Sequence, residues 1–261
     1  MTPEEKSIME EKQNIPETEK NKGTGGRSGI ILRMENVSKK YGTGRVLKNC
    51  NITLKKGEVM AVIGPEGHGK STLAKVAAGL VAPTRGSVII RGVKAGRATN
   101  SVVSYQPDIP YFKYDYTVSE ILNLYSGFFM DFSYKKAYHL LNHFDISRRT
   151  RFENLSTTAL FIIQVILVSS RRASLYIFDD PLVHCDPKYR GDIITMIDKC
   201  RKYGAVMLLS QTAQGLDDIT DKVAFIRHGE IVKEFHNADD FEAEFGDSLL
   251  NDVYREVFKH A

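Results

Sequence analysis

Apolar and polar residues alternate along two stretches near the start of the chain, residues 30–37 and 46–54. A period of two is typical of strands that bury one face, so each stretch predicts a strand. Residues 58–63 form a short apolar run, which predicts a strand buried on both faces. Residues 86–92, bounded by glycines, and residues 102–105 predict two further strands. The first part of the chain is therefore predicted to be rich in strands.

The pattern changes near Tyr116, where apolar residues begin to recur at helical spacing. They stand at positions 118, 121, 122, 124 and 125, and again at 137, 140, 141 and 144. This spacing predicts helices over residues 117–154. Strands and helices then alternate, at residues 174–179 (strand), 187–202 (helix), 205–210 (strand), and 223–227 with 231–235 (a strand pair). A parallel α/β core with a helical insertion accounts for this order.

Residues 160–168 are apolar on every side of the helix that they would form. A helix of this kind is typical of a segment buried between two parts of a protein. The alternative is an unusually apolar contact surface for another subunit. The sequence leaves both interpretations open.

Size and composition limit the classes of protein to which the chain can belong. Its 261 residues are 42% hydrophobic, enough for one large core or a core with an attached lobe. No apolar run approaches the roughly 20 residues of a membrane-spanning helix, and the start of the chain lacks the apolar stretch of a signal peptide. Three widely spaced cysteines fit a reducing cytoplasm. The net charge of +4, without a basic stripe interleaved with aromatic residues, predicts no nucleic-acid partner.

Residues 1–29 differ from the rest of the chain because they are dense in Glu, Lys, Asn and Gly and contain few apolar residues. Such a segment cannot bury enough surface to offset the entropy of ordering it. We therefore expect a flexible, charged tail, with a partner-binding role as the alternative.

One segment carries a specific chemical signal: residues 64–72 read GPEGHGKST and match the pattern G-x-x-x-x-G-K-[ST]. The predicted strand at 58–63 precedes it and a helical pattern follows it, which is the context that a phosphate-binding loop requires. The predicted nucleotide-binding residues of this loop are Gly64, Pro65, Glu66, Gly67, His68, Gly69, Lys70, Ser71 and Thr72. His68 occupies a position that the motif leaves open.

The chemistry of the loop follows from its residue types. Its glycines let the backbone curl so that successive N–H groups face one anion, and the start of the following helix adds a positive dipole. Lys70 can reach the β- and γ-phosphates, and Ser71 can ligate Mg²⁺. The loop therefore predicts binding of a nucleoside triphosphate.

A second element ends in two carboxylates: residues 175–178 are apolar and are followed by Asp179 and Asp180. A buried strand of this kind presents its last side chains at the carboxyl edge of the sheet, where ligands bind in α/β proteins. Asp179 is suited to hold Mg²⁺ through water beside Ser71, and Asp180 is suited to orient an attacking water.

These motifs, in this order, resemble those of the nucleotide-binding subunits of ABC transporters, over about residues 30–235. Tyr41 resembles the aromatic residue that stacks on adenine; a half-buried tyrosine at a strand end is the alternative. Residues 107–110 and 117–120 resemble the Q-loop and the start of the helical lobe. Residues 155–159 lie where the LSGGQ signature belongs, residues 186–187 resemble the D-loop end, and Gln211 stands in the place of the switch histidine.

The resemblance implies an α/β P-loop NTPase fold with an N-terminal antiparallel β subdomain and an inserted helical lobe. It predicts an ATPase domain over residues 30–240, with the lobe at about 107–170, and a short helical extension over 241–261. It also implies ATP and Mg²⁺ as cofactors, a second ATPase subunit and a membrane permease as partners, and a location at the cytoplasmic face of the cell membrane. Small exporter-type ATPases of Gram-positive bacteria are the most similar subgroup.

The chain departs from the family pattern at its catalytic positions. Asp180 replaces the usual glutamate, which withdraws the carboxylate by about 1.5 Å. Gln211 replaces the switch histidine and cannot carry a positive charge or relay a proton. With Lys70, these two are the predicted catalytic residues. We therefore expect good ATP binding and slow hydrolysis, or, as the alternative, a non-transport ATPase or an ATP-dependent clamp that barely hydrolyses ATP.

Departures also occur among the predicted binding residues. The Q-loop glutamine register falls on Asp108, although Gln106 lies two residues away and could substitute. The signature glycines are replaced by Thr157 and Thr158, while Ser156 remains as a possible N-cap and phosphate contact. The predicted metal ligands are accordingly Ser71, Asp179 and Asp108, and Tyr41, Gln106, Asp108 and Ser156 complete the predicted nucleotide site. A heterodimer with an intact second subunit would share these defects between two sites, and a homodimer would carry them in both.

Overall fold

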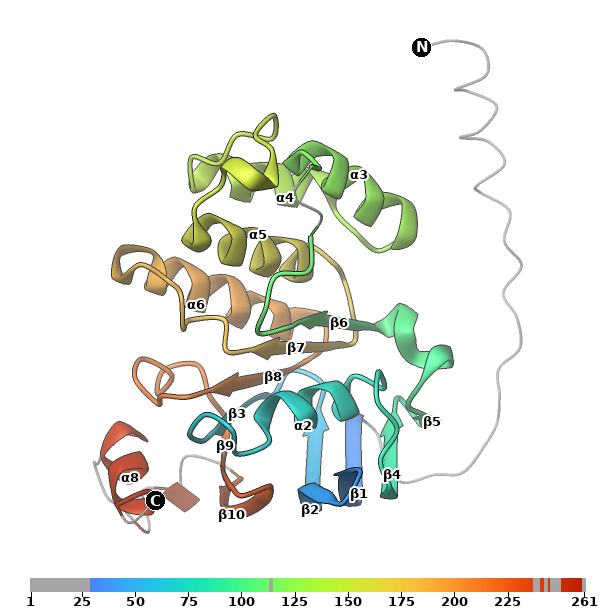
Figure 1. Ribbon diagram of the computed structural model, residues 1–261, viewed down its shortest axis with the longest axis vertical. Helices are drawn as coiled ribbons and strands as arrows, with labels where there is room; N and C mark the ends of the chain where they lie inside the picture. The colour runs from blue at the N-terminus through green and yellow to red at the C-terminus, as the bar shows by residue number, and fades with distance from the viewer. Residues whose placement is uncertain (1–28, 113–114, 237–239, 242–243, 245–249, 260–261) are drawn as a thin grey trace.

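The computed structural model describes residues 29–112, 115–236, 240–241, 244 and 250–259, and contains two β-sheets with helices packed around them (Figure 1). The predicted tail, residues 1–29, lies outside the described residues apart from Gly29. The strands are β1 (Ile30–Tyr41), β2 (Gly44–Lys55), β3 (Val59–Ile63), β4 (Arg85–Ile90), β5 (Val93–Lys94), β6 (Val103–Gln106), β7 (Leu175–Asp179), β8 (Ala205–Ser210), β9 (Lys222–Arg227) and β10 (Glu230–Phe235). The helices are α2 (Lys70–Ala77), α3 (Val118–Phe128), α4 (Tyr134–His143), α5 (Thr157–Ser169), α6 (Arg190–Asp198) and α8 (Leu250–Val257).

The smaller sheet has the strand order β2-β1-β4-β5, and all of its pairings are antiparallel. It contains the two alternating stretches near the start of the chain, so these strands and the antiparallel β subdomain are confirmed. The short strand β5 was not predicted, because Val93 and Lys94 are both exposed and give no burial pattern.

The larger sheet has the order β10-β9-β3-β8-β7-β6. Strand β3 pairs in parallel with β8 and β9, and β7 pairs in parallel with β6 and β8. Strand β10 is antiparallel to β9, because a two-residue turn joins them. Parallel strands end at the same edge of a sheet, so β3, β7 and β8 bring residues from distant parts of the sequence together.

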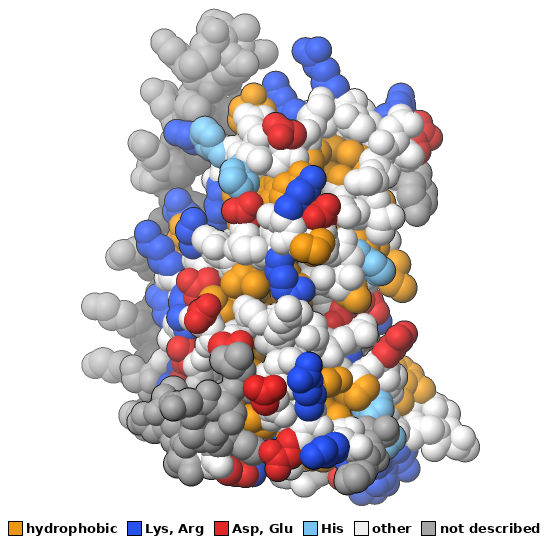
Figure 2. All heavy atoms as spheres, turned by 90° about the vertical axis from the view of Figure 1, so that its left-hand side faces the viewer, with side chains coloured by type: hydrophobic (Ala, Val, Ile, Leu, Met, Phe, Trp, Pro, Cys, Tyr) orange, Lys and Arg blue, Asp and Glu red, His pale blue; other side chains and the backbone are white. Residues whose placement is uncertain are grey.

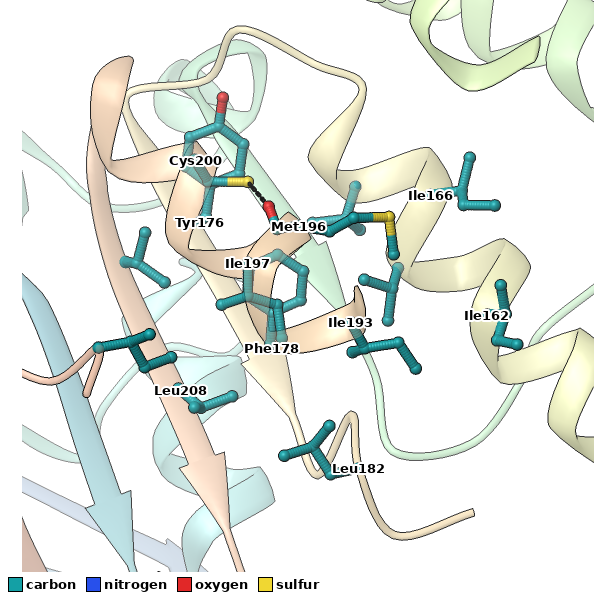
Figure 3. Close-up of a cluster of buried hydrophobic side chains, with 14 of the residues drawn as sticks. Ile162, Ile166, Tyr176, Phe178, Leu182, Ile193, Met196, Ile197, Cys200 and Leu208 are labelled. Atoms are coloured by element: carbon teal, nitrogen blue, oxygen red, sulfur yellow. Dashed lines mark hydrogen bonds between the residues drawn. The ribbon is translucent and has the colours of Figure 1, made fainter. Parts of the chain in front are cut away.

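Two apolar layers cover the larger sheet, one on each face. Alternate residues of each central strand enter different layers: Val59 and Ala61 face one, and Met60 and Val62 face the other. Helix α2 and the smaller sheet cover the second face, while α5 and α6 cover the first (Figure 1). Figure 3 shows side chains of α5 and α6, among them Ile162, Ile193 and Ile197, directed toward those of β7 and β8. Burial on both faces explains the apolar runs of the central strands.

Helix α5 is buried over most of its length, with residues 161–168 all excluded from solvent. It lies between the sheet and the helices α3 and α4 (Figure 1). Of the two interpretations of this apolar segment, burial within the chain is therefore the correct one for these residues.

The three helices α3, α4 and α5 occupy the interval between β6 and β7, at one end of the molecule (Figure 1). Helix α3 begins at a capping box, in which the backbone N–H of Thr117 donates to the Glu120 carboxylate (2.6 Å) and the backbone N–H of Glu120 donates to Thr117 Oγ1 (3.3 Å). The segment 187–202, predicted as one helix, instead consists of α6 flanked by two short 3₁₀ turns, Pro187–Tyr189 and Lys199–Lys202.

Arg171 joins the helical lobe to the sheet. Its guanidinium donates to Asp131 Oδ1 (2.9 Å) and to the backbone carbonyls of Val103 and Ser101 (2.5 Å each), and it lies over the ring of Phe129. The side chain is only 2% exposed, so its charge depends on these partners rather than on water.

Replacing Arg171 with Met is expected to lower the free energy of unfolding by about 2–3 kcal/mol, because it leaves Asp131 and two carbonyls unpaired. Urea denaturation followed by circular dichroism measures this change. Arg172→Met is the matched control, since Arg172 is exposed, and we expect a change below about 0.5 kcal/mol. Equal effects of the two substitutions would show that the buried network does not hold the lobe to the sheet.

Candidate nucleotide-binding site

The glycine-rich loop connects β3 to α2 and curls over the start of that helix. Gly67 and Gly69 have φ angles of 77° and 100°, a region that side chains with a Cβ rarely adopt. A Cβ on Gly64 would lie 2.4 Å from the carbonyl oxygen of Ile226, and the N–H of Gly64 donates to the carbonyl of Ser210 (3.1 Å). The loop can therefore take this shape only with glycine at these positions.

The side chain of Lys70 turns back along the loop. Its ammonium group donates to the carbonyls of Gly64 (2.9 Å) and Pro65 (3.0 Å) and lies 3.6 Å from Asp180 Oδ2. Only 4% of the residue is exposed. A positive charge is thus held in a site of low dielectric, where it would interact strongly with a bound phosphate.

The carboxylate of Asp179 is fully buried at the end of β7, and neither of its oxygens has a hydrogen-bond partner. Burial raises the pKa of Asp179 to about 7; the nearby Ser71 hydroxyl opposes this effect, and the neighbouring charges of Asp108 and Asp180 add to it. A buried carboxylate whose oxygens make no hydrogen bond is unusual in a folded protein and is suited to hold a cation.

The oxygen atoms around Asp179 fit a hard cation such as Mg²⁺. Ser71 Oγ lies 3.4 Å from Asp108 Oδ2, and both residues line the same cavity. Hydroxyl and carboxylate oxygens are the ligands that Mg²⁺ prefers, usually together with water and substrate phosphates. Among the residues that the structure describes, no cluster of three or more His, Cys, Asp or Glu forms a metal site on its own.

Asp180 is held in place by Gln211. The backbone N–H of Gln211 donates to Asp180 Oδ1 (2.8 Å), and its side-chain amide lies 3.4 Å from Oδ2. Burial raises the pKa of Asp180, while Lys70 and Gln211 work in the opposite direction. The backbone of Asp180 is left-handed, with a φ angle of 50°, which aspartate tolerates better than most residues.

Lys70, Ser71, Asp108, Asp180 and Gln211 line a cavity of about 490 Å³ at the carboxyl edge of the larger sheet, whereas Asp179 is fully buried and does not line it. The cavity is lined by Val46, Glu66, Gly67, Gly69, Lys70, Ser71, Thr72, Asp108, Ile109, Asp180, Val183, His184 and Gln211. Most of the loop and the two predicted catalytic partners of Lys70 therefore meet at one cavity. The predicted site residues did not include Val46, Ile109, Val183 and His184. Ile109 carried a signal because it follows Asp108 in the predicted Q-loop, and Val183 and His184 carried one because they follow the strand-end carboxylates closely.

Several predicted residues do not line this cavity. Of the two candidates for the Q-loop role, Asp108 lines the cavity, whereas Gln106 is fully buried and donates to the carbonyl of Pro107 (3.1 Å). Tyr41 is 49% exposed at the end of β1, with the ammonium group of Lys39 5.0 Å from its ring centroid. Ser156 is an exposed N-cap of α5, accepting from the N–H of Ala159 (3.2 Å). The roles of Tyr41, Gln106 and Ser156 in binding stay predictions.

His68 does not line the cavity and stacks on His228, with ring centroids 4.6 Å apart. Its Nδ1 accepts from the backbone N–H of His228 (3.3 Å). Burial lowers the pKa of His68, and the positive charges of His228, Lys70 and Arg227 add to this effect. The side chain therefore fastens the loop to the turn between β9 and β10.

The pKa of Asp179 makes the stability of the ligand-free chain depend on pH. Above pH 7 the folded chain holds a buried negative charge that the unfolded chain exposes to water, so stability falls as the pH rises from about 4 to 7. Asp179→Asn is expected to raise the free energy of unfolding by roughly 2–4 kcal/mol at pH 8 and by almost nothing at pH 4.

Urea denaturation at the two pH values tests this expectation. Asp218→Asn, at an exposed position, is the control and should be neutral at both. A destabilising effect of Asp179→Asn at pH 8 would contradict the proposed burial of an unpartnered charge.

The family model described as "ABC transporter" matches residues 47–183. The lantibiotic transport ATP-binding protein SrtF of Streptococcus pyogenes is 28% identical over 230 residues, covering 84% of this chain and 98% of the relative. The linearmycin resistance ATP-binding protein LnrL of Bacillus subtilis is 26% identical over 211 residues, covering 77% of this chain and 68% of the relative.

Solved structures agree in fold. The structure of an ATP-binding subunit of an ABC transporter has a TM-score of 0.77 and 24% identity, covering 87% of this chain and 99% of that one. A dimeric, post-hydrolysis ATP-binding cassette bound to ADP and Pi has a TM-score of 0.71 and 19% identity, covering 79% of this chain and 98% of that one. At these identities the likeness establishes the α/β P-loop NTPase fold.

No helix in the described part of the chain has both the length and the apolar character needed to cross a membrane.

Proposed function

Because the chain belongs to the ABC transporter family, whose members bind ATP, we propose that it is the ATP-binding subunit of an exporter and hydrolyses ATP slowly. The observation that carries this proposal is the intact phosphate loop, with its buried Lys70 beside the carboxylates of Asp179 and Asp180. Relatives named for lantibiotic transport and linearmycin resistance support an exporter. The alternative is a clamp that binds ATP and barely hydrolyses it.

Lys70 is central to ATP binding in this proposal. Lys70→Ala is expected to weaken ATP binding tenfold to about a hundredfold, because a buried charge-assisted contact to the phosphates is lost. Isothermal titration calorimetry with Mg-ATP measures the change. The control is Lys75→Ala, at the last turn of α2 and outside the cavity, which should bind ATP as the unmodified chain does. Unchanged binding by Lys70→Ala would contradict the assignment of the site.

We propose that Ser71, Asp108 and Asp179 hold Mg²⁺ when ATP is bound. The support is the cluster of hard oxygen donors and the unpartnered, buried carboxylate of Asp179. The ion would neutralise phosphate charge in the site, and it would stabilise the charged form of Asp179, whose pKa burial raises. In this arrangement Asp108 contributes a carboxylate where the family usually places an amide.

Slow hydrolysis follows from the state of Asp180. Its short carboxylate is occupied by the backbone and side chain of Gln211 and lies close to Lys70, so little of it is free to orient a water. Gln211 in turn supplies an amide and no charge at the γ-phosphate position. The proposed site thus has the groups needed to bind the phosphates of ATP, but Asp180 and Gln211 are poorly suited to activate a water molecule for hydrolysis.

Restoring the usual residues tests the proposal of slow hydrolysis. The double variant Asp180→Glu with Gln211→His is expected to raise kcat about tenfold or more with little change in ATP affinity. Steady-state phosphate release and calorimetric ATP binding are the two measurements. Asp180→Asn is the companion variant: it should lower the residual turnover if Asp180 acts as a weak base. No gain in the double variant and no loss in Asp180→Asn would favour the non-hydrolysing clamp.

Two partners complete the proposed transporter. A second ATP-binding subunit would close the open side of the cavity, in keeping with the dimeric cassette among the similar structures. We favour a different subunit, since Thr157 and Thr158 place side chains where close backbone approach is usual. A membrane permease would dock on the helical lobe, where Phe128 and Met130 are 77% and 95% exposed.

Docking on a permease would keep the chain at the cytoplasmic face of the cell membrane.

On the face shown in Figure 2, basic side chains are interspersed with acidic and hydrophobic ones rather than joined in one basic surface. The absence of a nucleic-acid partner stays a prediction.

A further inference from the structure

The smaller sheet carries a second cavity, of about 500 Å³, which shares no lining residue with the nucleotide site. Three segments contribute to it: β1, β2, and residues 84–86 at the start of β4. It is lined by Asn36, Ser38, Lys40, Arg45, Lys48, Asn49, Thr84, Arg85 and Gly86. We call it the basic cavity, because four of these residues are Lys or Arg and none is Asp or Glu.

The positive charges of the basic cavity are only partly compensated. Lys48 pairs with Glu230 at 2.9 Å, and the charge of Arg45 also contributes to lowering the pKa of Glu230. Within the described ranges, Lys40, Arg45 and Arg85 make no ion pair within 4.0 Å. Like charges that converge on one cavity repel each other, so a bound anion would stabilise the arrangement.

The walls of the basic cavity are irregular where regular strands would be expected. Asn36 and Asn49 have left-handed φ angles of 51° and 50°, and the pairing of β1 with β2 shifts register around Val37. Side-chain hydrogen bonds fix both bulges: the N–H of Asn36 donates to Asn51 Oδ1 (2.8 Å), and that of Asn49 donates to Ser38 Oγ (3.0 Å). Bulges of this kind redirect side chains and are common beside functional sites.

The turn before β4 is locked against the same bulge. Gly86 has a φ angle of 83°, and a Cβ there would lie 2.4 Å from the carbonyl oxygens of Glu35 and Asn36. The N–H of Lys40 donates to Thr84 Oγ1 (3.0 Å), which fixes the other side. Arg85, which pairs with Ser38 across the two strands, is therefore held at the wall of the cavity by backbone geometry.

We propose that the basic cavity binds a small anion that carries two or more phosphate groups. Arginine presents a planar fork that matches phosphate oxygens, and lysine adds a point charge. The hydroxyl groups of Ser38 and Thr84 offer further donors. The volume exceeds that of one phosphate, and the three cationic side chains without an ion pair, Lys40, Arg45 and Arg85, match an ion with several negative charges.

The same chemistry could be presented by a soluble ion or by a phospholipid headgroup. The smaller sheet lies at the end of the molecule opposite helices α3 and α4 (Figure 1), and thus far from the exposed Phe128 and Met130. This placement favours a soluble ion, and the experiment separates the two sources.

Calorimetric titration of the full-length chain with inorganic pyrophosphate tests the proposal. The Lys70→Ala background weakens binding in the phosphate loop, so the remaining binding event reports on the basic cavity. Adding Lys40→Gln with Arg85→Gln is expected to weaken this event about tenfold or more. The matched control adds Lys94→Gln with Arg97→Gln, which removes one lysine and one arginine from exposed positions outside the cavity and should leave the event unchanged.

Three outcomes would overturn the proposal: no binding beyond that of the loop, equal weakening by the control pair, or no weakening by the cavity pair. Flotation with vesicles containing anionic or only zwitterionic phospholipid is the second arm. Binding to anionic vesicles that depends on Lys40 and Arg85, without pyrophosphate binding, would assign the cavity to a lipid headgroup and overturn the soluble ion. ATP binding and the unfolding midpoint of the Lys40→Gln with Arg85→Gln variant, measured with Lys70 intact, verify its fold.

Discussion

The ammonium group of Lys70 is buried, and its position depends on the loop around it. Two carbonyls of the loop and the carboxylate of Asp180 take the place of water around this charge. The carbonyls can point inward only because glycine at position 64 lets the loop pass against β9. Carbonyl dipoles stabilise this buried cation and leave it enough positive charge to attract the phosphate groups of a nucleotide.

The parallel register of the larger sheet gives this cation its neighbours. Ile63 at the end of β3 is paired with Ser210 at the end of β8, and Asp179 at the end of β7 is paired with Leu209. The carboxylates and Gln211 therefore reach Lys70 across more than a hundred residues of sequence. The hydrophobic core keeps these residues together, because the apolar layers on both faces of the sheet fix the register of its strands.

In the proposed function, binding and hydrolysis would depend on different parts of this arrangement, so that one could be retained while the other is weakened. The loop, Ser71 and the buried Asp179 would provide charge and oxygen ligands for a nucleotide and its metal ion. Asp180 and Gln211 bond mainly to each other. A short carboxylate satisfied by its neighbour stabilises the site but has little capacity left for a water molecule. The proposed anion site in the basic cavity would lie on the smaller sheet, close in sequence to Val46, which that sheet contributes to the nucleotide cavity.

The sequence by itself determined the phosphate loop, the strand that ends in Asp179 and the two alternating strands near the start of the chain, whereas the burial of α5 within the chain was decided by the tertiary structure. The loop and the strands each depend on residues that are close together in the chain, so periodicity and motif spacing are sufficient to predict them. Only the tertiary structure decided which of two neighbouring Q-loop residues faces Ser71, that His68 stacks on His228, and that the cations of the smaller sheet converge. These depend on bulges and strand register, where a shift of one residue moves a side chain to the other face, and no local pattern fixes that choice.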